Sequence, residues 1–313
     1  MTLTLDDIYA AQERLAAYLH PTRLEPAASL GPQVYLKLEN TNITRSFKVR
    51  GALNAVLALD TKARQRGLVT ASSGNHAQGL AYAAALISAP AKILMPEGTP
   101  QRKIDGVSAH GAEAVVFGAT YDEAEAEARR LERESGYTYI SPYNDVQVAA
   151  GQGTIGLEIL EQLPEVARVL VCVGGGGLIA GVSTAIKALR PQTEVIGVGA
   201  RNAPPMYNRF HQTQLPERYP TLAEALAGEI EQGSITVPLI RQHVDDMMLV
   251  SEDEIAEAMR WCVFQAGWVV EGGGAVAVAA ALSEAVPLDE RPTAMLVSGG
   301  NVDAATLERV LCG

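Results

Sequence analysis

Lys48 lies in the stretch SFKVRGALNAV (residues 46–56), where a turn leads into an apolar segment that is predicted to be a helix. The partial positive charge at the start of a helix disfavours an ammonium group there. The same position, together with burial, lowers the pKa of a lysine and keeps its amine neutral part of the time. A neutral amine can attack an aldehyde or accept a proton. Lys48 is therefore the first candidate for a catalytic residue.

Four consecutive glycines separate the strand-like run RVLVCV from the helix-like run LIAGVSTAIKAL. They are Gly174, Gly175, Gly176 and Gly177. Without Cβ atoms, these residues let the backbone turn sharply and present several N–H groups at the start of the helix. Such a loop is a cradle for an anion, most often a phosphate. A tight strand-to-helix turn needs only one glycine, so a purely structural role does not account for four.

A dinucleotide site is the alternative for this loop. Gly175, Gly177 and Ala180 fit the spacing G-x-G-x-x-A, and Glu194 follows further along the chain. The acid that binds ribose belongs at the C-terminal end of the second strand, whereas Glu194 stands at the start of the run TEVIGVG. We therefore favour a phosphate site, and an NAD-binding oxidoreductase stays the alternative.

A second site is indicated by ASSGNHAQG (residues 71–79), at the end of the strand-like run LVTAS. Its short polar side chains and the N–H groups of the following helix start can donate hydrogen bonds to a carboxylate. The residues concerned are Ser72, Ser73, Gly74, Asn75 and His76. His76 has no other histidine at metal-ligand spacing, so we expect a structural or supporting role for it and no metal site.

The run TAMLVSGGN near the end of the chain places Ser298 at the end of a strand-like segment. Open α/β sheets bind ligands at the carboxyl ends of their strands. Together, the amine of Lys48, a phosphate cradle, a carboxylate loop and this hydroxyl match the needs of one cofactor. Pyridoxal 5'-phosphate has the aldehyde, the aromatic ring and the phosphate that these groups would bind.

The composition narrows the choice of partners. A formal net charge of −11 argues against a surface for nucleic acids or anionic membranes, because either would need basic residues. Cys172, Cys262 and Cys312 are odd in number and far apart, which predicts neither a disulfide framework nor a zinc site. The start MTLTLDDIYAAQERLAAYL lacks the basic segment and apolar run of a signal peptide. We expect a cytoplasmic protein with a small-molecule partner and no nucleic-acid or membrane partner.

Short apolar runs alternate with helix-like patterns along most of the chain. This alternation predicts parallel strands joined by right-handed crossover helices, and therefore an α/β fold. The strand-like runs are residues 34–39, 68–72, 91–96, 112–118, 137–140, 168–174, 193–199, 246–250 and 293–300. The helix-like runs are residues 6–19, 47–59, 75–87, 101–109, 121–135, 154–163, 178–189, 252–266 and 275–285. Residues 202–242 are rich in proline and form either a cap over a site or a long connection.

In their order and combination, these motifs resemble those of the fold-type II pyridoxal-phosphate enzymes, in the branch of the threonine/serine dehydratases and serine racemases. The motifs are SFKVRGA, SSGNHAQG, AGQGTIGLEIL, VGGGGLIAG and SGGN, and the resemblance runs from residue 20 to residue 303. It implies a tryptophan synthase β-like α/β fold of two open domains with mostly parallel sheets. We place the large domain at residues 1–66 and 143–313, and the small inserted domain at residues 67–142. A homodimer is implied by the resemblance alone.

The resemblance also implies a role for each motif residue. Lys48 holds the cofactor as a Schiff base, and Phe47 flanks its ring. Asn75 contacts the 3'-oxygen, Ser298 faces the pyridine nitrogen, the four glycines bind the phosphate, and residues 72–76 bind the substrate carboxylate. The implied reaction is β-elimination from L-threonine or L-serine to a 2-oxo acid and ammonia, with Lys48 as the base on the α-proton. An uncharged Ser298 favours elimination over transamination.

The chain departs from this family at several positions. Arg45 precedes Ser-Phe-Lys where the family usually has glycine, so the turn or the entrance of the site differs, and we favour a side chain in solvent. Ser73 stands where a racemase has its base on the second face, which leaves serine racemase open as an alternative beside 3-hydroxyaspartate dehydratase. Positions of metal-binding carboxylates in serine racemase read Gly199, Pro204 and Pro205 here, so we expect no metal ion.

Overall fold

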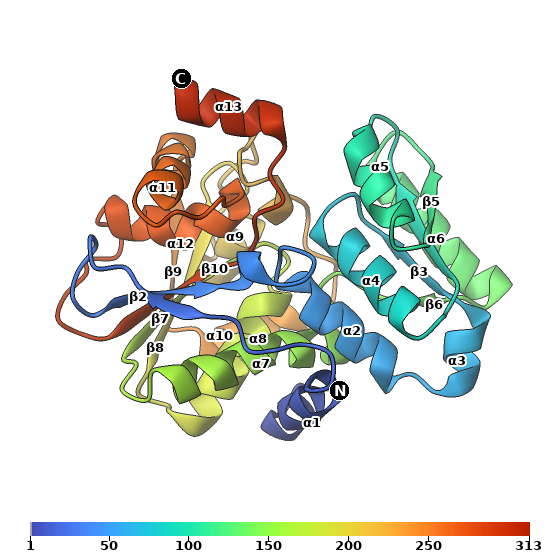
Figure 1. Ribbon diagram of the computed structural model, residues 1–313, viewed down its shortest axis with the longest axis horizontal. Coiled ribbons are helices and arrows are strands. Elements are labelled where there is room, and N and C mark those ends of the chain that lie inside the picture. The colour runs from blue at the N-terminus through green and yellow to red at the C-terminus, as the bar shows by residue number, and fades with distance from the viewer. Residues whose placement is uncertain (1) are drawn as a thin grey trace.

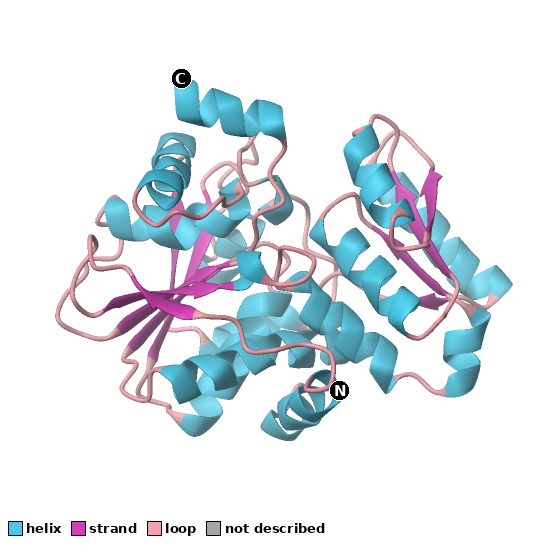
Figure 2. Cartoon of the chain, in the orientation of Figure 1, coloured by secondary structure: helices cyan, strands magenta, loops and turns pink. Residues whose placement is uncertain are grey.

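The computed structural model describes residues 2–313, and within them the strands form two separate sheets (Figure 1 and Figure 2). The larger sheet contains β1 (Leu24–Pro26), β2 (Val34–Leu38), β7 (Arg168–Cys172), β8 (Glu194–Ala200), β9 (Asp246–Val250) and β10 (Thr293–Val297), in the order β1-β2-β10-β7-β8-β9. Only the β1–β2 pair is antiparallel. The smaller sheet contains β3 (Leu68–Ala71), β4 (Ala91–Met95), β5 (Glu113–Val116) and β6 (Thr138–Tyr139) in the parallel order β5-β4-β3-β6.

Helices cover both sheets. On the larger sheet, α11 (Glu252–Phe264) and α12 (Gly272–Leu282) lie on one face, and α7 (Val146–Gln162) and α8 (Gly177–Leu189) lie on the other (Figure 1). Helix α2 (Lys48–Ala58) lies between the two sheets and packs on α4 (Asn75–Leu86) and on α7. The remaining helices are α1 (Leu5–Leu15), α3 (Thr61–Arg66), α5 (Gln101–Ser108), α6 (Tyr121–Ser135), α9 (Pro205–His211), α10 (Thr236–His243) and α13 (Ala304–Cys312), with short 3₁₀ turns η1 (Glu39–Thr41) and η2 (Glu224–Leu226).

The predicted α/β fold with mostly parallel sheets is confirmed. The short elements β1, α3, α9, α10 and α13 were not among the predicted runs. The domain boundaries stay a prediction, and α2 and α4 pack together across the boundary placed at residue 66. In the part of the chain that the structure describes, no helix is long and apolar enough to span a membrane.

Helix α7 begins at Val146, whereas the sequence pattern placed its start at residue 154. The missed first turns contain glycine, which is a poor helix former in an exposed helix. Here the glycines allow backbones to approach closely: a Cβ on Gly151 would lie 2.6 Å from the carbonyl oxygen of Arg50 in α2. A Cβ on Gly181 of α8 would lie 2.2 Å from the carbonyl oxygen of Ala149. Tertiary packing therefore outweighs local helix propensity in this segment.

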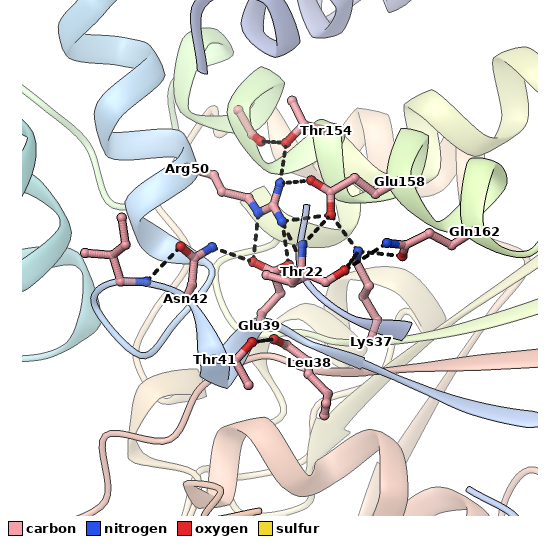
Figure 3. A network of polar contacts seen from close by, with 12 residues as sticks. Thr22, Lys37, Leu38, Glu39, Thr41, Asn42, Arg50, Thr154, Glu158 and Gln162 are labelled. Atoms are coloured by element: carbon pink, nitrogen blue, oxygen red, sulfur yellow. Dashed lines mark hydrogen bonds and ion pairs between the residues drawn. The ribbon is translucent and has the colours of Figure 1, made fainter. Parts of the chain in front are cut away.

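A network of four buried charges joins β2, η1, α2 and α7 (Figure 3). The guanidinium of Arg50 donates to both carboxyl oxygens of Glu39, at 2.8 Å each, and also to both carboxyl oxygens of Glu158. Lys37 donates to Glu158 and to the carbonyl oxygen of Thr22. Two cations thus balance two anions, and burial without such pairing would be strongly unfavourable. Through Arg50, two residues after Lys48, the network fixes the position of α2.

We predict that Glu158→Gln lowers the free energy of unfolding by about 3 to 5 kcal/mol, because it leaves two buried cations with one carboxylate. Glu161→Gln is the matched control, since Glu161 lies exposed on the same helix and should change the free energy of unfolding by less than about 0.5 kcal/mol. Urea unfolding followed by circular dichroism measures both variants. Equal stabilities of the two variants would contradict a structural role for the network.

Candidate active site

Lys48 is the first residue of α2, and its side chain is partly buried. Its Nζ donates a hydrogen bond of 2.6 Å to the carbonyl oxygen of Pro142 and lies 5.2 Å from the centre of the Phe47 ring. Burial lowers the pKa of Lys48 to about 8, although Cys172 and Glu271 act in the opposite direction. A substantial share of neutral amine is therefore present at neutral to mildly alkaline pH.

The motifs around Lys48 and Ser298 lie side by side. The backbone N–H of Phe47 donates to the carbonyl oxygen of Ser298 at 3.0 Å, and Ser46 forms an isolated bridge with Gly299. Ser298 is buried at the end of β10. Burial raises the pKa of the neighbouring Cys172 thiol to about 11, although a hydrogen bond with Ser298 acts in the opposite direction. Both groups next to Lys48 are thus neutral at physiological pH.

The glycine loop connects β7 to the start of α8. Gly176 has a φ of +88°, a backbone conformation that residues with side chains rarely adopt. A Cβ on Gly175 would lie 2.5 Å from the Tyr143 ring, and one on Gly174 would lie 2.8 Å from the Cα of Leu226. The first N–H groups of α8 have no acceptor within the helix, so they can bind an anion. Glycine is required here because a side chain at these positions would collide with the residues packed around the loop.

The proline-rich segment 202–242 packs over the glycine loop. This packing decides whether the segment is a cap or only a long connection. A Cβ on Gly176 would meet Ile240 of α10 and Met206 of α9 at 2.7 and 2.9 Å. The hydroxyl of Thr236 donates to the carbonyl oxygen of Gly175 at 2.9 Å. The hydroxyl oxygen of Tyr143 accepts a hydrogen bond from the backbone N–H of Glu231. The segment is therefore a cap and not only a connection.

The predicted carboxylate loop connects β3 to α4. Ser72, Ser73 and Gly74 are partly exposed, and Asn75 and His76 are buried at the start of the helix. The backbone N–H of Gly74 donates to the Ser72 hydroxyl at 3.2 Å. Partly exposed short residues before a helix start are well placed to donate hydrogen bonds to a small anion. The binding of a carboxylate here stays a prediction.

The ring of His76 is unsuited to hold a carboxylate directly. Its Nε2 lies 3.0 Å from the carbonyl oxygen of Ile140, which can only accept a hydrogen bond, so Nε2 carries the proton. Burial, together with the charge of nearby Lys48, lowers the pKa of His76 to about 3. The neutral ring then presents only a lone pair at Nδ1. His76 can therefore contribute to the predicted carboxylate loop through its backbone N–H.

Sequence reasoning gave no role to Glu271 or Asn301, which the structure brings to Asn75. The Nδ2 of Asn75 donates to Oε1 of Glu271 at 2.6 Å, and its Oδ1 accepts from Nδ2 of Asn301 at 2.7 Å. Burial raises the pKa of Glu271 to about 7, although the hydrogen bond from Asn75 acts in the opposite direction. The signal in the sequence was a lone glutamate directly before three glycines, in EGGGAVAV.

Arg45 keeps the turn that glycine would make. Its φ is +55°, and its side chain is exposed, as expected. Its carbonyl oxygen accepts a hydrogen bond from the N–H of Gly300 at 2.9 Å, which ties the turn to the end of β10. Arg45 therefore adopts a positive φ at the position where the resembled motif has glycine.

The dinucleotide alternative does not agree with the structure. Glu194 is the first residue of β8, at the end of the strand away from the glycine loop, and pairs with Arg168 at 2.8 Å and Arg291 at 3.1 Å. A ribose-binding acid would have to lie at the other end of this strand. Among the residues from 2 to 313, no group of three His, Cys, Asp or Glu side chains is arranged to hold a metal ion.

The site as a whole fits pyridoxal phosphate. It combines a partly buried amine of lowered pKa, a loop of four glycines whose Cβ positions are taken by neighbouring residues, and a buried neutral hydroxyl at a strand end. Residues 15–299 match the family described as pyridoxal-phosphate dependent enzyme. The chain belongs to this family. The predicted family and cofactor are thereby confirmed, and the site can be described as that of a pyridoxal-phosphate dependent enzyme.

Known proteins are similar to this chain along nearly its whole length. The chain is 44% identical to L-threonine ammonia-lyase of Thermotoga maritima, over 99% of this chain and 78% of that protein. The structure of maize serine racemase is similar with a TM-score of 0.92 and 33% identity, covering 100% of this chain and 98% of the other. The crystal structure of T.th. threonine deaminase has a TM-score of 0.87 and 41% identity, covering 96% and 99%.

We predict that the apoprotein takes up pyridoxal phosphate at a rate that rises about tenfold per pH unit and levels off near pH 8, because only the neutral Lys48 amine attacks the aldehyde. A lysine with the ordinary pKa of 10.5 would show a rate that continues to rise above pH 9. Stopped-flow absorption measures the rate, and Lys48→Ala, which should give no band of lysine-bound cofactor, is the control. A plateau above pH 9 would contradict a lowered pKa.

We predict that Arg45→Gly raises the free energy of unfolding by about 1 kcal/mol, because glycine adopts a positive φ without the strain of a side chain. The exposed Arg45 side chain has no contact that this substitution would remove from the core. Arg23→Gly serves as the control, since Arg23 is exposed and its φ is not positive. Thermal unfolding should show a gain for the first variant only; a loss in both would contradict strain at Arg45.

Proposed function

We propose that this pyridoxal-phosphate enzyme deaminates L-threonine, and L-serine as a second substrate, to the 2-oxo acid and ammonia. The observation that carries the proposal is the partly buried amine of Lys48, with its lowered pKa, in a chain 44% identical to L-threonine ammonia-lyase of Thermotoga maritima. The likeness to T.th. threonine deaminase supports the same substrate, at 41% identity. L-Threonine would lose the elements of water and regain them on hydrolysis, which yields 2-oxobutanoate and ammonium.

When bound, pyridoxal phosphate supplies an electron sink for the carbanion that remains after removal of the α-proton. Lys48 would hold the cofactor and, once released by the substrate amine, accept the α-proton at Nζ. Its lowered pKa suits it for both tasks, because the neutral form is accessible near physiological pH. Phe47 would flank the ring, and its backbone is already bonded to Ser298.

The other predicted residues would bind and orient. Gly174, Gly175, Gly176 and Gly177 would donate backbone N–H groups to the phosphate. Ser298 would face the pyridine nitrogen as a neutral partner, which limits delocalisation and favours loss of the β-hydroxyl over transamination. Asn75 would donate to the 3'-oxygen. The loop Ser72, Ser73, Gly74, Asn75 and His76 would hold the substrate carboxylate, chiefly through N–H groups.

Serine racemisation is a second candidate activity. The maize serine racemase structure is similar along the whole chain, with a TM-score of 0.92. Ser73, partly exposed in the carboxylate loop, would serve as the base on the face opposite Lys48. 3-Hydroxyaspartate is a further candidate substrate.

We also propose that the protein is a cytoplasmic homodimer. Each subunit would have a large domain at residues 1–66 and 143–313 and a small inserted domain at residues 67–142. The two sheets of the structure support this division.

The test is a substrate assay on the purified holoenzyme. L-Threonine, L-serine and 3-hydroxyaspartate are supplied separately, and 2-oxo acid, ammonia and D-serine are measured. We expect 2-oxobutanoate and ammonia in equal amounts from L-threonine, with kcat/KM highest for this substrate and at least about a thousandfold lower for Lys48→Ala. D-Serine without 2-oxo acid would favour racemisation instead. Equal rates for the parent protein and Lys48→Ala would overturn the assignment of Lys48.

A further inference from the structure

The side chain of Asn75 lies between two others in a hydrogen-bond chain of four groups. Asn301 donates from Nδ2 to the backbone carbonyl oxygen of Thr44 at 2.9 Å and to Oδ1 of Asn75 at 2.7 Å. Asn75 in turn donates from Nδ2 to Oε1 of Glu271 at 2.6 Å. These residues come from the turn before α2, the start of α4, the start of α12 and the segment after β10. These hydrogen bonds therefore connect a segment next to the smaller sheet with segments next to the larger sheet.

The carbonyl oxygen of Thr44 determines which groups donate and which accept along these hydrogen bonds. The carbonyl oxygen of Thr44 can only accept, so the group of Asn301 that faces it must be the amide nitrogen. The second N–H of that nitrogen points to Asn75, which must then present its oxygen. The nitrogen of Asn75 is thereby turned to Glu271, which accepts. Without these partners, the two ends of a carboxamide are interchangeable.

Glu271 is held tightly against the backbone of the SGGN segment. A Cβ on Gly299 would lie 2.2 Å from Oε1 of Glu271 and 3.2 Å from Nδ2 of Asn75. The N–H of Glu271 donates to the carbonyl oxygen of Gly299 at 3.1 Å. The ionisable groups near its carboxyl are Lys48, Cys172, Lys103 and Glu224. A carboxyl group confined in this way has little freedom to follow a change in its partner.

We propose that Glu271 and Asn301 are positioning residues that orient the carboxamide of Asn75 with its nitrogen toward the cofactor. The proposal rests on the predicted contact of Asn75 with the 3'-oxygen of pyridoxal phosphate. One N–H of Asn75 is used by Glu271, and the other remains for that oxygen, which is an acceptor. A reversed carboxamide would present its own oxygen there, and two acceptors would repel each other.

The first test reverses the polarity at one end. Asn301→Asp replaces the donor by a carboxylate, which only accepts, so the Asn75 carboxamide turns and presents its nitrogen to residue 301. We expect pyridoxal phosphate to bind the apoprotein about tenfold more weakly, the size expected for one charge-assisted hydrogen bond. The absorption maximum of the bound cofactor should also shift. Gln265→Glu is the matched control, because Gln265 is exposed and undergoes the same change of chemistry.

The second test separates positioning from stability. In Asn301→Asp/Glu271→Gln, the glutamine nitrogen can donate to the reversed oxygen of Asn75, which restores both hydrogen bonds of the Asn75 carboxamide with opposite polarity. The lost bond to the Thr44 carbonyl oxygen is common to this variant and to Asn301→Asp. The apoprotein should therefore melt at a higher temperature than Asn301→Asp alone. Cofactor affinity should nevertheless stay about tenfold below that of the parent, because the wrong end of Asn75 still faces the 3'-oxygen. Glu271→Gln alone, in which the glutamine oxygen can still accept from Asn75, should retain more affinity than the double variant.

The outcomes are distinct. Parent-like cofactor affinity in the double variant would overturn the proposal, because it would mean that Glu271 and Asn301 only stabilise the fold. Parent-like affinity in Asn301→Asp would overturn it as well. Asn75→Ala tests the premise, and unchanged affinity and spectrum there would show that Asn75 does not contact the cofactor. None of these measurements uses substrate turnover, so a failure of the proposed threonine activity would appear separately in the substrate assay.

Discussion

Four buried charged side chains hold the start of α2 in place, and the position of Lys48 depends on them. Arg50 binds Glu39 on one side and Glu158 on the other, and Lys37 completes a neutral set. Because each unpaired charge would be costly in the interior, the four partners must come together in one arrangement. Figure 3 shows the contacts of Arg50. Lys48 lies two residues before Arg50, so the backbone position of Lys48 follows from this arrangement.

Close backbone approach is the second constraint on α2. Glycines in α7 and α8 let three helices pack without side chains between them, and Gly79 of α4 packs against the backbone of Lys48, where a Cβ would lie 3.2 Å from its carbonyl group. The helix that carries Lys48 is thus enclosed by backbone on several sides. The proposed covalent role of Lys48 would gain from such a fixed support. Glycine therefore allows close packing at two places in this protein, between the helices and in the loop after β7.

The site itself is built largely from neutral groups. Burial raises the pKa of Cys172 and lowers those of Lys48 and His76, so each of these three groups is shifted towards its uncharged form. Such surroundings suit a reaction in which a proton moves between nearby atoms, because little charge has to be created or desolvated at each step. The carboxyl of Glu271 belongs to the same environment, and burial raises its pKa to about 7.

The sequence by itself determined the α/β class, most strands, the family and the cofactor, because strand periodicity, glycine runs and a lysine at a helix start are local signals. It left the start of α7 undetected, since glycines that serve packing are indistinguishable from glycines that end a helix until the neighbouring backbone is known. It also could not pair Glu271 with Asn75, or Arg50 with Glu158, which are separated by many residues. Only the tertiary structure decides such contacts, because the burial of a polar group and its hydrogen-bond partner depend on which distant segment the fold places against it.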